Sequence, residues 1–243
     1  MHFNRIFLCL LCLTAILLGS CSRAAATATD VGEMATASED EAFIDTLTFL
    51  GDSTTAHMLS RAPLKDGERS KSVWAAKSRY LNLSPRITYE KIVCPTNGAE
   101  MTIAEAAATL RPARLVITLG IDYGVYYYRN DPDTFAYYYE KLLNAIGEAS
   151  PQTTIILQSI FPVGKNSAVI TNEMIDRANA VIADIAKRRS LVYVDANTPL
   201  KDAEGYLAPA YCYSEDGIHL SRAGYDVIFE NLKKYEKEVN GQP

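Results

Sequence analysis

Five short runs of apolar and β-branched residues are spaced along the chain. Runs of this length and composition, bounded by polar or turn-forming residues, are typical of strands. The last three runs are almost continuously apolar, as expected when helices cover both faces of a parallel sheet. The predicted strands are residues 46–50, 87–93, 114–119, 153–159 and 191–195.

Helical patterns alternate with these strands. The first two predicted helices stop before a proline, and the third ends in basic residues that complement the helix dipole. Alternating strands and helices predict a right-handed, doubly wound parallel sheet whose site lies beyond the carboxyl ends of the strands. Residues 62–84 form a long connection and a candidate wall of that site. The predicted helices are residues 102–110, 133–149, 171–189 and 221–239.

The N-terminus has a different pattern. Arg5 precedes an apolar stretch that is short for a membrane-spanning helix and ends in small residues, which predicts a signal peptide over residues 1–20. The Leu-Gly-Ser-Cys sequence that ends at Cys21 resembles the bacterial lipobox, in which the cysteine is acylated. An ordinary cleavage site with a chance cysteine and an uncleaved anchor helix are the alternatives. Residues 21–41 are small and polar and predict a flexible tether.

Residues 42–243 are then one folded domain, since 243 residues with 48% hydrophobic and 22% charged residues fit a single globular unit. The net charge of −5 provides no basic surface for nucleic acid. Acyl chains on Cys21 would hold the domain at a bacterial membrane, outside the cytoplasm. Cys94 and Cys212 are the cysteines left in the domain. They either pair in an oxidising compartment or remain two separate thiols.

The first predicted strand leads into Gly51-Asp52-Ser53. A glycine lets the chain turn sharply, and a serine at the start of a helix can offer both a hydroxyl and an unpaired backbone N–H. Ser53 can therefore supply a nucleophile and one oxyanion donor together. Taken alone, this tripeptide more often provides only a helix cap, from Asp52 or Ser53.

A nucleophilic serine needs a base, and two histidines of the domain can serve. His57 follows Ser53 by four residues without an evident carboxylate partner, which favours a solvated position or a pocket wall. Asp216 precedes His219 by three residues, so one turn places a carboxylate beside an imidazole. We predict Ser53 as nucleophile, His219 as base and Asp216 as its partner. Two histidines form no metal-ligand cluster, and no metal or cofactor is expected.

Together, Gly51-Asp52-Ser53 and Asp216-x-x-His219 resemble blocks one and five of the SGNH (GDSL) hydrolase family. The likeness covers about residues 43 to 238. It implies a flavodoxin-like, three-layer α/β/α sandwich with a five-stranded parallel sheet. It also implies a serine ester hydrolase activity that uses the same three residues in the same roles.

Two further blocks of this family supply oxyanion donors. Gly98 best matches the glycine of block two and would donate its backbone N–H, although Asn97-Gly98 is also a plain turn signal. Block three reads Gly-x-Asn-Asp in the family, and here Asp122 occupies the asparagine position. An ionised aspartate donates no hydrogen bond. Asp122 is therefore protonated through burial, or faces away while another N–H substitutes, or marks a weakened site.

Tyrosines are concentrated after block three. They suit a rim for sugar rings or acyl chains, with plain helix packing as the alternative. These tyrosines are Tyr123, Tyr126, Tyr127, Tyr128, Tyr137, Tyr138 and Tyr139.

The resulting functional hypothesis is an extracytoplasmic serine esterase or deacylase that acts on an acyl-ester substrate. Removal of acetyl or other acyl groups from carbohydrate or cell-envelope glycan is the leading reaction. This substrate class rests on the compartment and on family analogy rather than on a particular residue. A lipid or thioester acylhydrolase is the enzymatic alternative. A catalytically weak, glycan-binding surface lipoprotein is the alternative from another class.

Overall fold

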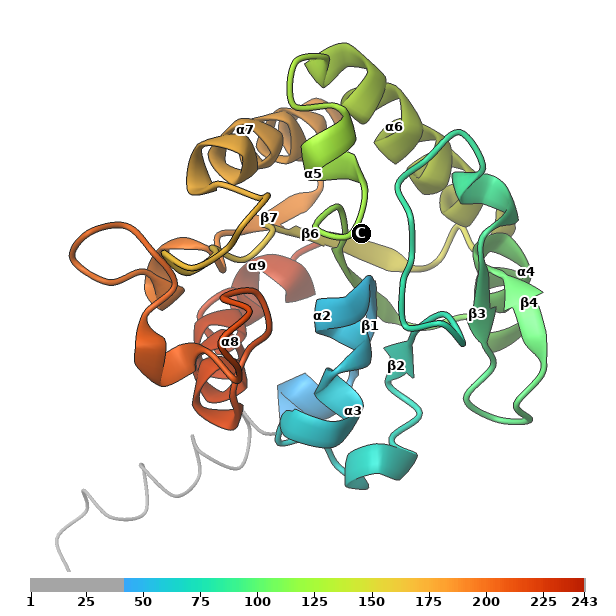
Figure 1. Cartoon of the computed structure of the whole chain (residues 1–243). Helices are drawn as coiled ribbons and strands as arrows, with labels where there is room; N and C mark the ends of the chain where they lie inside the picture. The colour runs from blue at the N-terminus through green and yellow to red at the C-terminus, as the bar shows by residue number, and fades with distance from the viewer. Residues whose placement is uncertain (1–41, 243) are drawn as a thin grey trace, which may run out of the picture.

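The computed structural model of the chain describes residues 42–242. The predictions for the signal peptide, the tether and Cys21 lie outside these residues. The described part is built on one sheet of five parallel strands in the order β2-β1-β5-β6-β7, which Figure 1 shows at the centre of the molecule. Its strands are β1 (Leu47–Gly51), β2 (Val73–Trp74), β5 (Arg114–Thr118), β6 (Thr154–Gln158) and β7 (Val192–Val194).

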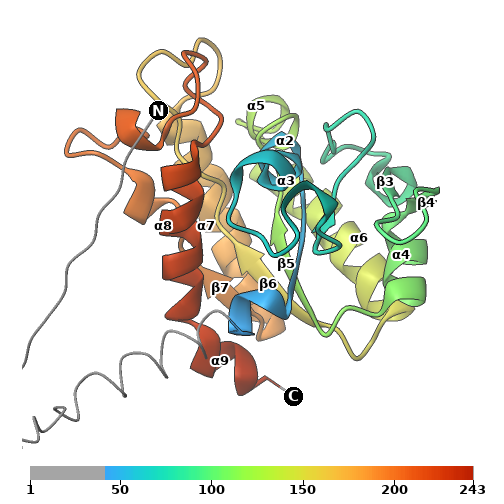
Figure 2. The ribbon, with the colours of Figure 1, turned by 90° about the horizontal axis from the view of Figure 1, so that it is seen from below.

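Each face of the sheet packs against its own layer of helices. Successive side chains of a strand point to opposite faces, so Leu115 and Ile117 of β5 enter one apolar core, whereas Val116 enters the other. Figures 1 and 2 show one helical layer on each side of the sheet, which confirms the predicted three-layer α/β/α sandwich. One layer holds α4 (Ile103–Leu110), α6 (Pro132–Ala149) and α7 (Asn172–Arg189), and the other holds α3 (Met58–Arg61), α8 (Arg222–Lys233) and α9 (Glu236–Asn240).

The longer helices begin at side-chain caps that satisfy their free backbone N–H groups. Thr102 and Glu105 form a capping box at α4, and the caps of α6, α7 and α8 are Asp131, Thr171 and Ser221. Three of the predicted helices are thereby confirmed to within one or two residues. The fourth is divided, because α8 ends at residue 233 and α9 starts at residue 236. Among the described helices, none combines the length and apolarity that crossing a membrane requires.

The second predicted strand was wrong. Residues 87–89 form a 3₁₀ turn, and β3 (Lys91–Val93) pairs antiparallel with β4 (Glu100–Thr102) in a separate two-stranded sheet. The main sheet instead takes β2 from the 62–84 connection, beside β1. Because β2 has only two residues, it shows no periodic pattern in the sequence.

The carboxyl ends of β1 and β5 lie side by side. Gly51 is in register with Thr118 across the two strands. The short helices α2 (Ser53–Ala56) and α5 (Gly124–Tyr127) follow these strand ends. The residues after Gly51 and those after Thr118 therefore meet at one edge of the sheet, where an open α/β sheet places its site. Four 3₁₀ segments complete the described part: Gly67–Arg69, Ile87–Tyr89, Thr198–Leu200 and Pro209–Tyr211.

Candidate active site

Ser53 is the first residue of α2 and is buried at the carboxyl edge of the sheet. The turn from β1 into α2 is possible because residue 51 is a glycine. A Cβ atom there would lie within 3.0 Å of the Thr118 carbonyl oxygen and the Thr55 hydroxyl oxygen. Asp52 caps α2 by accepting a hydrogen bond from the Thr54 N–H. The cap and the candidate nucleophile are thus adjacent residues with separate tasks.

His219 and Asp216 come to Ser53 on the loop that precedes α8. Nδ1 of His219 is 2.7 Å from Oδ2 of Asp216, and Nε2 of His219 is 3.2 Å from the Ser53 hydroxyl oxygen. The backbone N–H groups of Ile218 and His219 donate to the other oxygen of Asp216. Burial opposes the charge of Asp216, but the hydrogen bonds from His219 and Ile218 outweigh it and hold the pKa of Asp216 well below its usual value. Ser53, His219 and Asp216 thus form one continuous chain of contacts.

The loop that carries Asp216 is fixed by a neighbouring loop. The Gly164 N–H donates to the Gly217 carbonyl at 2.7 Å, and the Asn166 amide donates to the Glu215 carbonyl. Gly217 has a φ of 69°, which favours glycine, and any Cβ there would also overlap Asn166. The carboxylate is therefore held by the backbone on both sides of residue 216.

Asp122 faces Ser53 rather than away from it. The Ser53 N–H donates to Oδ2 of Asp122 at 2.9 Å, and the Ser53 hydroxyl is 2.6 Å from Oδ1. Burial raises the pKa of Asp122, although the hydrogen bonds from Ser53 and the nearby His219 partly counter it. Of the three explanations for this aspartate, the one in which it faces away was wrong.

A second carboxyl group lies beneath this contact. Asp52 is fully buried and accepts hydrogen bonds from the N–H groups of Gly120 and Ile121, each at 2.9 Å, and from Thr54. Burial and the neighbouring Asp122 raise the pKa of Asp52 to about 7, although these hydrogen bonds oppose the rise. Asp52 therefore joins the β1 turn to the β5 turn and places Ser53 beside Asp122.

His57 packs edge-on against the ring of His219, with 4.4 Å between the ring centroids. Burial is the main reason that the pKa of His57 falls to about 4, and the neighbouring His219 and Arg61 add to the effect. His57 is thus half-buried against the candidate base, and the fully solvated interpretation does not fit this position. Arg61 was missed in the sequence, although its spacing of four residues from His57 on a helical segment was an available signal.

Gly98 does not take the place predicted for it. It lies in the turn between β3 and β4, and its N–H donates to the Cys94 carbonyl at 2.9 Å. Gly98 was assigned as a donor on the assumption that residues 87–93 belong to the main sheet. Since that strand belongs to the small antiparallel sheet, the N–H of Gly98 serves a local turn rather than the oxyanion.

The two domain cysteines do not form a disulfide. Cys94 is buried with its sulfur 3.1 Å from the Thr96 hydroxyl, and Cys212 donates from its thiol to the Ser214 carbonyl at 2.8 Å. Each thiol is thus engaged within its own loop. Of the two alternatives that the sequence left open, two separate thiols agree with the structure and a disulfide does not.

The tyrosines after β5 form a connected group. Tyr123, which directly follows Asp122, stacks on Tyr127 with 4.0 Å between the ring centroids, and Tyr126 meets Tyr127 edge-on. Tyr126, Tyr127 and Tyr137 are exposed, whereas Tyr139 is buried in the core. The sequence left open whether these residues form a rim or pack internally, and the structure divides them between the two.

Comparison with known proteins identifies the family of the chain. The model of the GDSL-like lipase/acylhydrolase family matches residues 49–227, a range that includes Ser53, Asp122, Asp216 and His219. Among curated proteins, none matches the chain.

Solved structures share the fold at low sequence identity. A GDSL-like lipase from Bacteroides thetaiotaomicron is 18% identical, with a TM-score of 0.56, and the match covers 84% of this chain and 97% of that one. A catalytic mutant of an acetylxylan esterase from Geobacillus stearothermophilus is also 18% identical, with a TM-score of 0.50 and coverage of 78% and 93%. The extensive family match and the shared fold agree, and the chain therefore belongs to the GDSL-like lipase/acylhydrolase family of serine ester hydrolases.

Proposed function

We propose that Ser53, His219 and Asp216 act as nucleophile, general base and orienting carboxylate in the hydrolysis of a carboxylic ester. The observation that carries this proposal is the uninterrupted series of contacts from Asp216 through His219 to the Ser53 hydroxyl, at 2.7 Å and 3.2 Å. Asp216 accepts from Nδ1–H of His219, which leaves Nε2 free to take a proton.

In acylation, the Ser53 oxygen attacks the ester carbonyl and its proton passes to Nε2 of His219. The bond between the acyl carbon and the alcohol oxygen then breaks, and the alcohol leaves with that proton. Water repeats the sequence on the acyl-serine: it gives a proton to His219, bonds to the acyl carbon and releases the acid as the proton returns to Ser53. The negatively charged Asp216 stabilises the imidazolium in both halves.

The oxyanion of each tetrahedral intermediate requires donors. The Ser53 N–H is one, and we assign protonated Asp122 as another. Asp52 already accepts from two backbone N–H groups and from Thr54, so the ionised form of Asp52 is well supported. Two buried carboxyl groups this close do not readily carry two charges. The proton that they share therefore belongs on Asp122, where it makes a carboxyl group a hydrogen-bond donor.

Carbohydrate is the substrate class that we propose for this site. The stacked Tyr123 and Tyr127 begin directly after Asp122, and the exposed Tyr126 and Tyr137 extend the aromatic surface outward. Aromatic faces bind the apolar faces of sugar rings, while phenol hydroxyls remain free for hydrogen bonds. The expected reaction is removal of acetyl or other acyl groups from a glycan. A lipid or thioester acylhydrolase differs from it only in the acyl group and the leaving group.

We further propose that the enzyme acts outside the cytoplasm, anchored to a membrane by acyl chains on Cys21. The support is the lipobox-like sequence at residues 18–21 and the polar tether that follows it. Two or more acyl chains give stable anchoring. Mass spectrometry of the intact protein from bacterial membranes would show the acylated Cys21 as the first residue. An unmodified Cys21 would contradict the anchor but not the hydrolase.

The second candidate function is glycan binding without efficient catalysis. The observation that favours it is that Asp122 occupies the Ser53 N–H, which is an oxyanion donor in the enzymatic proposal. Hydrolysis of p-nitrophenyl acetate by the full chain in detergent separates the two. We expect Ser53→Ala to reduce the rate to background, whereas Ser190→Gly, which changes an exposed serine at the C-terminal end of α7, leaves it unchanged. Equal rates for all three proteins would end the hydrolase proposal and leave glycan binding.

A further inference from the structure

Two arginines, Arg61 and Arg79, lie near His57, which packs against the candidate base His219. Arg61 ends α3, with Nη1 3.3 Å from Nδ1 of His57 and its guanidinium carbon 3.4 Å from the centroid of the Tyr213 ring. Arg79 lies on the loop after β2 and lines a cavity together with Ala56, the residue before His57, and its charge helps to lower the pKa of His57. Within residues 42–242, neither arginine forms a salt bridge. Their charges are therefore available to a ligand.

His57 connects these charges to the catalytic histidine. An arginine can only donate hydrogen bonds, so Nδ1 of His57 must be the acceptor of the contact with Arg61. His57 is then neutral, in agreement with its lowered pKa. Asp216 is the negative group near His57, and it is already paired with His219. The positive potential on this side of the site thus comes from Arg61 and Arg79.

The catalytic geometry determines which part of the substrate meets this potential. The leaving alcohol receives its proton from Nε2 of His219, so it must lie on the His219 side of Ser53. His57 lies on that side, in contact with His219, and Arg61 in turn contacts His57. The Asp122 carboxyl group lies against Ser53 itself, where the acyl oxygen must bind. The alcohol part of the ester therefore faces the arginines, whereas the acyl part does not.

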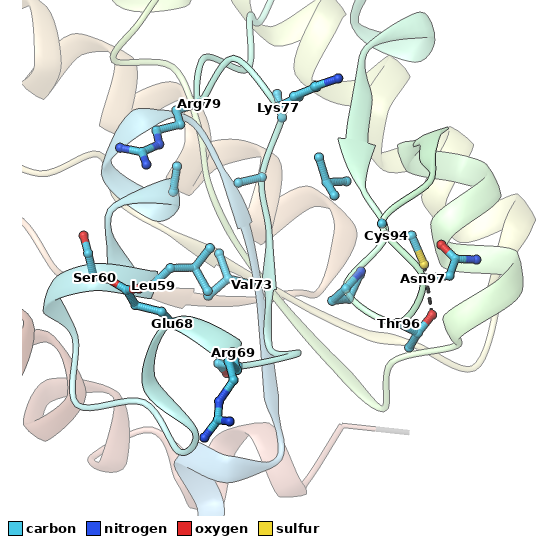
Figure 3. Close-up of a pocket in the computed structure, with 17 residues that line it drawn as sticks. Leu59, Ser60, Glu68, Arg69, Val73, Lys77, Arg79, Cys94, Thr96 and Asn97 are labelled. Carbon is cyan, nitrogen blue, oxygen red and sulfur yellow. Dashed lines mark hydrogen bonds between the residues drawn. The ribbon is translucent and has the colours of Figure 1, made fainter.

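A cavity of about 580 Å³ begins at Ala56, one helical turn after Ser53, and Arg79 is among its lining residues. Figure 3 shows Arg79, Lys77 and Arg69 distributed around this cavity. Glu68 is the one acidic residue among the lining residues. Lys77 is paired with Glu100, at 3.8 Å, which leaves Arg69 and Arg79 as the lining cations without a salt bridge among the described residues. Arg79 thus belongs both to the surroundings of His57 and to this cavity, where an extended anionic ligand would meet positive charge.

Given the ester hydrolysis proposed above, we propose that the alcohol part of the substrate carries an anionic group, a carboxylate or a phosphate, that binds Arg61 and Arg79. In glycan terms, the substrate is an acylated acidic sugar chain rather than a neutral one. Arginine suits this task because its planar guanidinium donates two parallel hydrogen bonds to either group. The stacking of Tyr213 on Arg61 holds the guanidinium in place without neutralising it.

A matched pair of small esters tests this proposal. 4-Acetoxyphenylacetate carries its charge on the leaving group, and 4-acetoxyphenylacetamide is its neutral counterpart. At low ionic strength we expect kcat/KM to favour the charged ester by about tenfold, the effect of roughly one charge-assisted hydrogen bond. Arg61→Gln and Arg79→Gln should each reduce this preference severalfold, mainly through KM, while Arg61→Lys should retain part of it. Added salt should weaken the preference.

Arg111→Gln is the control variant. Arg111 is also exposed and without a salt bridge among the described residues, but it lies between α4 and β5, at the edge of the sheet opposite the site. This variant should keep the preference of the unchanged protein. 4-Acetoxybenzylphosphonate distinguishes the two anion classes, because a stronger preference for it than for the carboxylate would indicate a phosphate-bearing substrate.

Equal kcat/KM values for the charged and neutral esters, with hydrolysis still dependent on Ser53, would overturn this inference and leave the ester hydrolase intact. If neither ester is hydrolysed, binding of the two product phenols to the Ser53→Ala protein provides the answer. Tighter binding of 4-hydroxyphenylacetate than of its amide, lost in Ser53→Ala/Arg61→Gln, supports the anion site even without turnover. Equal binding would overturn it.

Discussion

Asp122 contacts both the backbone N–H and the hydroxyl group of Ser53: Oδ2 accepts from the N–H at 2.9 Å, and Oδ1 lies 2.6 Å from the hydroxyl oxygen. The hydroxyl has one hydrogen to donate, and it also lies 3.2 Å from Nε2 of His219. If that hydrogen points to a neutral His219, Asp122 must supply the hydrogen of the shorter contact. If Asp122 is ionised, it takes the serine hydrogen and the serine is no longer poised for His219. Only the first arrangement prepares Ser53 for attack.

The pH dependence of Asp122→Asn follows from this proton. Burial raises the pKa of both Asp122 and Asp52, so the pair keeps its shared proton at a pH where an ordinary carboxyl group is ionised and loses it as the pH rises further. Activity of the unchanged enzyme should therefore fall toward alkaline pH. An asparagine donates at every pH, so the variant should match the enzyme near about pH 6 and exceed it by about 10²-fold at the alkaline end.

The measurement for this prediction is kcat/KM for p-nitrophenyl acetate across this range, corrected for spontaneous hydrolysis. A variant that is far more active already at about pH 6 would mean that Asp122 is ionised there and weakens the site. If kcat/KM changed with pH in the same way in both proteins at alkaline pH, the proton of the Asp122 carboxyl group would have no role.

Asp216→Asn tests how His219 is oriented. The substitution removes the charge that lies 2.7 Å from Nδ1 and permits the wrong imidazole tautomer. We expect kcat to fall by about 10²–10⁴-fold while KM changes little, since Asp216 does not touch the substrate. Asp226→Asn is the matched control, because Asp226 pairs with Arg222 on the exposed face of α8. Steady-state kinetics and thermal unfolding measure both variants. A reduced kcat in a protein that unfolds at the usual temperature would support the prediction, and a near-normal kcat would refute it.

Gly51→Ala tests whether the turn after β1 positions Ser53. The new methyl group would overlap the Thr118 carbonyl and the Thr55 hydroxyl, so β1 and α2 must separate from β5. Overpacking of this kind costs about 1–3 kcal/mol of unfolding free energy. Gly147→Ala is the control, because α6 has open space at that position and alanine favours a helix by up to about 1 kcal/mol. Urea unfolding measures both variants, and equal stabilities would contradict this role of Gly51.

Much of the fold was predictable because it depends on long apolar runs. The strands β1, β5, β6 and β7 and the helices α4, α6 and α7 lie close to their predicted positions. The strand β2 was not predictable, because two residues carry no period and the neighbouring β1 determines its place. The incorrect assignment of Gly98 followed from the misplaced second strand. The choice between a disulfide and two separate thiols depended on a distance between loops that a sequence does not contain.

The candidate site divides in the same way. Ser53, Asp216 and His219 stand in short local motifs, so the sequence could name them. The contact between Ser53 and Asp122 depends on the register of β1 against β5, which brings residues 51 and 118 together. The Arg61–Tyr213 contact joins the end of α3 to the loop before α8 and has no counterpart in the linear pattern.

The most direct test of the central claim is covalent labelling of the nucleophile. The full chain is treated with diisopropyl fluorophosphate, which transfers a phosphoryl group to an activated serine, and the modified peptide is located by mass spectrometry. We predict a single label on Ser53, absent in Ser53→Ala, strongly slowed in His219→Ala and unchanged in Ser190→Gly. An unlabelled Ser53 in a protein that still hydrolyses p-nitrophenyl acetate would contradict the account.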